Sequence, residues 1–200
     1  GDKFRICHRR GRNIEALYTL PAGDIEHSAN LLQREINKFS PALVNIDCGG
    51  LGVAVYDRLR SMGNGGILRK IDFGGTATNS DRYRNKRAEM YGNARDWLLD
   101  EPCSINIDEK TADMLQAELS VVKPKWVNNS QLLMQPKEEI KKDLGYSPDA
   151  ADAFVLTFAQ ALSTTASQAG MESRYKVATR KVLTSTQGIS RNKVRLGRTS

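Results

Sequence analysis

Apolar and polar side chains alternate at the start of the chain and give way to helical spacing further along. Residues 3–9 and 13–20 alternate on either side of Gly11, which predicts a β-hairpin with a turn at the glycine. Residues 25–36 then carry apolar side chains three and four positions apart, the spacing of one face of a helix. The first forty residues therefore predict a hairpin followed by an amphipathic helix.

Short apolar runs and helical segments interleave through the rest of the chain. Residues 42–47 are mostly apolar and read as a strand buried on both faces, and residues 67–72 read as the next strand. Residues 137–142 read as a basic, polar connector. The other predicted elements are a helix over 53–59, a helix over 83–99, an edge strand over 104–107, a helix over 109–119, a hairpin over 121–136 and a helix over 147–162. This order predicts an α/β fold with a mixed sheet.

The chain has a formal charge of +7, and this charge is unevenly distributed along the sequence. Residues 163–200 contain eight Lys and Arg but a single acid, so they hold the whole excess and residues 1–162 are neutral overall. We therefore expect one domain over 1–162 and a basic C-terminal tail over 163–200. Such a tail is either simply solvated or binds nucleic acid or an acidic protein surface.

Composition excludes several classes of protein. The three cysteines are widely spaced without a C-x-x-C pair, which argues against a zinc site or a disulfide framework and fits a reducing cytosol. Two histidines are too few for a histidine-built metal centre. The sequence has no G-x-x-x-x-G-K-[ST] phosphate loop and no apolar run of membrane-spanning length, so we expect no membrane association.

The segment 147–153, Ser-Pro-Asp-Ala-Ala-Asp-Ala, opens the last apolar helix. Ser147 suits the helix N-cap and Pro148 its first position. Asp149 and Asp152 lie three residues apart and so share one helical face. Two acids at the end of a buried helix either favour its positive dipole end or are neutralised by a divalent cation. The spacing alone leaves both explanations open.

Asp47 supplies a third carboxylate, at the end of the strand 42–47. Alone, such an aspartate is most simply a turn former or a helix cap. In an α/β sheet, however, ligands bind where strands end and glycine-rich turns begin. If Asp149 and Asp152 meet Asp47 there, three carboxylates can hold two divalent ions for phosphodiester cleavage, and Mg²⁺ prefers such ligands.

Clusters of basic residues could contact phosphates, although runs of charge usually mark solvated faces. Both tryptophans, Trp97 and Trp126, are expected in core or hairpin packing rather than as base-stacking platforms. The candidate phosphate contacts are Arg82, Arg84, Lys86, Arg87, Lys137, Lys141 and Lys142.

Several phrases together resemble a known family. Phe73-Gly74-Gly75, Asn85-Lys86-Arg87-Ala88-Glu89-Met90 and the 147–153 segment follow the opening hairpin and Asp47 in order. This arrangement over residues 1–162 resembles the C-terminal nuclease domain of a tailed-bacteriophage terminase large subunit, of the headful-packaging kind.

The resemblance implies an RNase H-like mixed β-sheet flanked by helices, with an extra β-hairpin before the last helix. It implies an endonuclease that cuts concatemeric double-stranded viral DNA during packaging into procapsids, with Mg²⁺ or Mn²⁺ as two ions. It makes Asp47 the central-strand ligand and Asp149, with Asp152, the last-helix ligands. The family also has an acid on a first strand, which would precede Lys3, so we expect that strand upstream of this sequence.

The resemblance further implies partners and a location. The full motor contains an N-terminal ATPase, a terminase small subunit and a portal protein, and the tail 163–200 is a candidate contact for portal or DNA. The expected location is the cytoplasm of the infected bacterial host, outside the stable virion.

Two other readings remain. One is a non-catalytic module that docks to DNA or portal, supported by the tail charge. The other is a RuvC-like Holliday-junction resolvase, since that enzyme has a similar D-A-A-D-A helix on the same fold.

Overall fold

The computed structural model describes residues 3–21, 23–127 and 130–160 of the 200-residue chain. The chain divides into two units, residues 1–161 and 162–200. The basic segment 163–200 lies outside the described residues, so its role as a DNA or portal contact stays a prediction. All elements below belong to the first unit.

The opening hairpin forms where the alternating pattern predicts it. β1 (Lys3–Arg10) pairs antiparallel with β2 (Asn13–Pro21), and Gly11 in the turn has a φ of +57°, which residues with a Cβ rarely adopt. β5 (Ser104–Ile105) pairs with β2 in parallel. These three strands make a mixed sheet in the order β1-β2-β5.

A separate parallel pair of strands presents Asp47 at its end. β3 (Val44–Asp47) and β4 (Leu68–Ile71) run in parallel, with Asp47 opposite Ile71. They are connected by α2 (Gly52–Leu59) and the π-helical turn η1 (Arg60–Asn64). This βαβ unit is what the interleaved pattern predicts for a parallel sheet.

α1 (Ile25–Phe39) covers this unit by packing on α2. Its N-cap is Asp24, whose carboxylate accepts the His27 N–H at 2.7 Å, the usual arrangement at a helix start. The buried core between α1, α2 and the strands consists of Ala29, Val55, Leu59 and Leu68.

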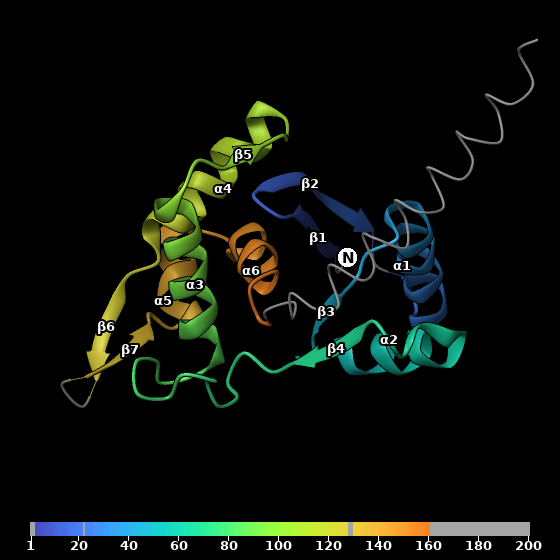
Figure 1. Cartoon of the computed structure of the whole chain (residues 1–200), viewed down its shortest axis with the longest axis horizontal. Coiled ribbons are helices and arrows are strands. Elements are labelled where there is room, and N and C mark those ends of the chain that lie inside the picture. The colour runs from blue at the N-terminus through green and yellow to red at the C-terminus, as the bar shows by residue number, and fades with distance from the viewer. Residues whose placement is uncertain (1–2, 22, 128–129, 161–200) are drawn as a thin grey trace, which may run out of the picture. The chain divides into compact units, whose positions relative to one another are not determined.

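The last helix lies at the centre of a second, larger core. α6 (Asp149–Leu156) packs against α3 (Lys86–Asp100) and α4 (Glu109–Val121) on one side and the β1–β2 hairpin on the other (Figure 1). Phe154 on α6 is fully buried, a contribution of about 2–3 kcal/mol to the hydrophobic stabilisation. Ring centroids of Trp97, Phe154 and Phe158 lie between 5.3 and 6.2 Å apart in edge-to-face contacts.

The predicted second hairpin is present, but the segment after it is not a connector. β6 (Pro124–Val127) pairs antiparallel with β7 (Gln131–Met134), and residues 137–142 then form part of a helix, α5 (Lys137–Leu144). Ile140 is fully buried and Gly145 ends the helix in a left-handed conformation with a φ of +80°. One buried side chain in two turns gives too weak a periodicity for the helix to be read from the pattern.

Trp126 differs from its prediction as well. Its side chain is 68% exposed on β6, whereas Trp97 packs in the core as expected. Position 126 lies opposite Leu132 in the ladder, yet the short ribbon extends past the main core and offers the indole little to pack against.

The α/β class with a mixed sheet flanked by helices is confirmed. The helix predicted over 147–162 is shorter: α6 runs over Asp149–Leu156, and residues 157–160 form turns. Within the ranges that the structure describes, no helix is both long and apolar enough to cross a bilayer.

Candidate functional site

Asp47 lies where β3 ends and shapes the turn that follows. Its Oδ1 accepts the Gly49 N–H at 3.0 Å, and its side chain is half-buried. Gly52, the first residue of α2, passes so close that a Cβ there would lie 1.9 Å from the Asp47 carbonyl oxygen. The turn-forming role expected of an isolated aspartate is therefore present, and the glycine allows the close approach of the chain.

Asp149 is the first residue of α6, and its side chain is exposed. Its N–H donates to the Ser147 carbonyl oxygen at 2.8 Å. The predicted Ser147 cap does not form, because the N-cap is Pro148 and no cap residue contributes a side-chain hydrogen bond. Within the described chain, the Asp149 carboxylate makes no hydrogen bond or ion pair, so its oxygens are accessible.

Asp152, one turn further along α6, is only 8% exposed and faces the protein interior. Its Oδ2 lies 2.6 Å from Lys137 Nζ, and its Oδ1 lies 3.8 Å from Arg87 Nε and accepts the Tyr91 hydroxyl at 3.2 Å. Burial, together with the Asp152 charge, raises the pKa of Tyr91. Two cations on other elements thus neutralise Asp152, which argues against a role as metal ligand.

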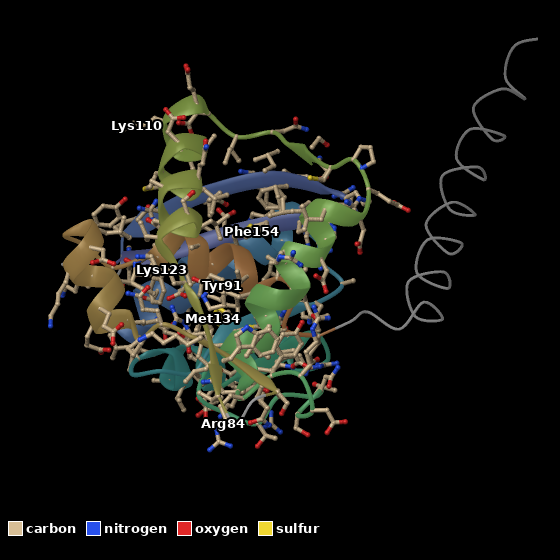
Figure 2. The ribbon with its side chains drawn as sticks, turned by 90° about the vertical axis from the view of Figure 1, so that its left-hand side faces the viewer. Arg84, Tyr91, Lys110, Lys123, Met134 and Phe154 are labelled. Atoms are coloured by element: carbon tan, nitrogen blue, oxygen red, sulfur yellow. The ribbon has the colours of Figure 1, made fainter. Side chains whose placement is uncertain are left out.

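Figure 2 shows Tyr91 and Phe154 together in the interior, where α3 and α6 meet. The Arg87 guanidinium lies over the Tyr91 ring, 5.2 Å from its centroid, and its Nη1 donates to the Gln135 carbonyl oxygen at 2.7 Å. The charge of Asp152 therefore sits in a network that joins α3, α6 and the end of β7.

The three predicted carboxylates do not form one cluster. Among residues 3–21, 23–127 and 130–160, no three His, Cys, Asp or Glu side chains lie close enough to hold a metal ion together. Asp47 and Asp149 are nevertheless on elements in contact, since Asn45 of β3 donates to the Leu156 carbonyl oxygen of α6 at 2.9 Å. The structure therefore places two accessible carboxylates on adjoining elements and turns the third inward.

Glu118 is a site residue that the sequence reasoning missed. It lies on α4, is fully buried, and its Oε2 accepts the Ala151 N–H in the first turn of α6 at 2.8 Å. Burial raises the pKa of Glu118, and the Asp149 charge adds to this, while the α6 N–H groups and Arg5 oppose it. The sequence did contain one indication that Glu118 faces the core. It lies three residues after Leu115, which is buried, and that spacing places both side chains on one helical face.

The predicted phosphate contacts divide into inward and outward side chains. Arg87 is buried, and Lys86 is held by Glu89 at 2.6 Å, so both serve the fold. Glu89 also accepts the N–H groups of Thr78 and Asn79 and thereby fixes the preceding loop.

The remaining candidates are at least partly exposed. Arg82 is exposed but paired with Asp96 at 3.2 Å, and Lys137 is partly exposed and paired with Asp152. Arg84 lies at the periphery (Figure 2), and Lys141 and Lys142 are exposed on α5. Of the seven candidates, these last three have exposed side chains for which the described residues provide no ion pair.

The arrangement of elements defines a class of fold. A mixed sheet, a βαβ unit whose first strand ends at Asp47 and a last helix that opens on Asp149 make up an α/β fold that is similar to that of a solved terminase nuclease domain. No family model and no curated protein match the sequence. The fold assignment therefore depends on comparison with solved structures.

Among the similar solved structures are several of one particular protein, the large terminase subunit gp2 of bacterial virus Sf6. A point variant of its nuclease domain with manganese and beta-thujaplicinol has a TM-score of 0.64 and 21% identity, over 78% of this chain and 81% of that chain. A variant with calcium has a TM-score of 0.63 and 21% identity over the same shares. The nuclease domain itself has a TM-score of 0.59 and 22% identity, over 78% and 81%. The expected fold is confirmed.

Proposed function

We propose that this chain is the nuclease domain of a tailed-phage terminase large subunit, a metal-dependent endonuclease that cuts concatemeric double-stranded DNA during packaging. The observation that carries the proposal is the shared fold with the Sf6 nuclease domain over 78% of the chain. Variants of the Sf6 domain were solved with manganese and with calcium, which supports a divalent ion as cofactor here.

The side chains at the site fit such an ion by their chemistry. Asp149 presents a free carboxylate and Asp47 a half-exposed one, and Mg²⁺ is commonly bound through one or two carboxylates with water and phosphate oxygens completing its shell. Asp47 and Asp149 would hold the ions. Bound divalent ions, two in this proposal, supply an activated water and stabilise the leaving oxygen in phosphodiester hydrolysis.

The other residues act on the substrate or on the fold. Arg84, Lys141 and Lys142 attract the DNA backbone, because exposed cations release counterions when they neutralise phosphates. Asp152 does not enter the chemistry in this proposal. It anchors α6, on which Asp149 lies, to Lys137 and to α3.

The biological setting belongs to the same proposal. Double-stranded DNA is the substrate, and a terminase small subunit, a portal protein and an N-terminal ATPase complete the motor in the cytoplasm of the infected host. The tail 163–200 is proposed as a contact for portal or DNA.

The test is cleavage of supercoiled plasmid with Mg²⁺, with Mn²⁺ and with EDTA, using both the 200-residue chain and a version extended upstream of Gly1. We expect nicking and linearisation that need the divalent ion. Asp47→Asn and Asp149→Asn should each reduce the rate at least about 100-fold, as expected for metal-holding groups. An intact plasmid with both ions and both proteins would refute the nuclease proposal.

The same assay separates the alternatives. A docking module would retain DNA on a gel without cleavage, and its binding would weaken steeply with salt. A junction resolvase would cut a four-way junction much faster than linear duplex. Comparable or preferred cutting of duplex supports the terminase assignment.

A further inference from the structure

We propose that Glu118 is a positioning residue that fixes the first turn of α6 and thereby the placement of Asp149. The inference rests on the proposed function, because Asp149 matters only if it holds the catalytic ion. It concerns a buried acid that no part of the cleavage chemistry uses.

Glu118 replaces the missing N-terminal cap of α6. The first N–H groups of a helix have no partner within the helix and are usually satisfied by a side chain of the N-cap residue. Pro148 at the N-cap provides none. Instead Glu118 Oε2, from α4, accepts the Ala151 N–H at 2.8 Å, and its carboxylate also accepts from the Ala150 N–H.

A buried carboxylate at this position destabilises the fold unless it is compensated by its hydrogen bond to the first turn of α6. The side chain is fully buried on the core-facing side of α4, where an apolar residue would pack without any desolvation penalty. Within the described chain, Glu118 Oε1 has no hydrogen-bond partner. The positive end of the α6 dipole is what compensates the buried charge.

The contact determines where Asp149 points. The Ala150 and Ala151 N–H groups lie directly after Asp149 and bind Glu118, and the Asp149 N–H binds the Ser147 carbonyl oxygen. The backbone is therefore fixed on both sides of Asp149. With the backbone held in this way, the Asp149 side chain is exposed to solvent and accessible.

The experiment compares Glu118→Ala, Glu118→Gln and the control Asp113→Ala, which removes an exposed acid from the same helix. Gln retains an oxygen for the Ala151 N–H, whereas Ala removes both acceptors. The readouts are amide hydrogen exchange at Ala150 and Ala151 and the Mn²⁺ concentration that gives half-maximal cleavage. A smaller active fraction does not shift that Mn²⁺ midpoint, and neither does a uniform loss of stability as long as the variant is fully folded without Mn²⁺, which circular dichroism checks.

For Glu118→Ala we expect a loss of protection at both amides beyond the global change, and an Mn²⁺ midpoint raised about 10-fold or more, as for partners that orient metal ligands. The Mn²⁺ midpoints of Glu118→Gln and of the control should stay within about 3-fold of the midpoint of the unaltered protein. If Glu118→Ala does not fold, Glu118→Asp, which shortens the reach by one methylene, is expected to show the same shifts at smaller size.

The outcomes separate the two proposals. An unaltered protein that cuts DNA, with variants whose Mn²⁺ midpoint is unchanged, overturns the positioning role and leaves the nuclease standing. Failure of Gln to restore the midpoint also overturns it. An unaltered protein that neither binds Mn²⁺ nor cuts overturns the nuclease proposal, and with it the role toward Asp149. Amide exchange still decides whether Glu118 holds α6.

Discussion

Asp149 and Asp152 lie on the same helix three residues apart, but their substitutions should affect different properties, cleavage in one case and stability in the other. Asp149→Asn is expected to abolish metal-dependent cleavage while leaving stability almost unchanged. Asp152→Asn is expected to lower stability while the folded fraction still cuts DNA. The difference follows from exposure, since one carboxylate faces solvent and the other is 8% exposed beside two cations.

The magnitude follows from the contacts of each carboxylate. Removing one partner of a buried ion pair costs about 3–5 kcal/mol, because the remaining charge stays buried. Lys137 is 41% exposed and can turn toward solvent, whereas Arg87 remains enclosed, so Asp152→Asn should cost somewhat less than this range, about 2–3 kcal/mol. Asp149→Asn loses a helix-dipole contribution but also the repulsion from Glu118, and its net effect should stay within about 0.5 kcal/mol.

The assay is urea unfolding followed by circular dichroism, with cleavage of plasmid measured at a temperature where both variants are folded. With a slope near 2 kcal/mol/M, Asp152→Asn should shift the midpoint down by about 1 M. A stable Asp152→Asn variant that fails to cut DNA would refute the reasoning, because Asp152 would then act in the chemistry. An unstable but active Asp149→Asn variant would refute it equally.

Three further substitutions test the packing and the titration of single groups. Gly92→Ala should cost about 2–3 kcal/mol in urea unfolding, since its Cβ would lie 2.2 Å from Tyr83 Oη; an unchanged midpoint would contradict that packing. Glu89→Gln should cost about 1–3 kcal/mol by leaving Lys86 without its partner, and a cost no larger than that of an exposed Glu→Gln change on the same protein would count against it. Burial lowers the pKa of His8, so its contribution to stability is present above the unfolded pKa of about 6.5 and is lost as pH falls below it. His8→Gln should therefore flatten the decline in unfolding free energy between pH 7 and pH 5, and an equally steep decline would exclude His8 as its source.

Local patterns predicted most elements because each depends on neighbouring residues. The alternation about Gly11 gave the first hairpin, and the apolar run ending at Asp47 gave the strand that leads into the βαβ unit. The helix predicted over 83–99 is present but begins later, at Lys86, because Asn85 caps it by accepting the Ala88 N–H at 2.9 Å. These signals lie within a few positions of the features that they determine.

The partners of charged side chains could not be predicted in the same way. Lys86 and Arg87 read as phosphate contacts, but one pairs with Glu89 and the other faces Asp152, which is 65 positions away. The cap of α6 comes from Glu118 on another helix rather than from the adjacent Ser147. A sequence shows which residues carry charge, but the fold decides which of them meet.

The position of α6 between the opening hairpin and the middle helices constrains the order of folding. β1 and α6 are in contact although residues 3–10 and 149–156 lie at opposite ends of the described chain. Contacts of such large sequence separation form late and slow the folding of a domain. During synthesis, the hairpin therefore emerges long before the helix that completes its core. The acid-bearing helix arrives last, so the site can assemble only when nearly all of the first unit has been made.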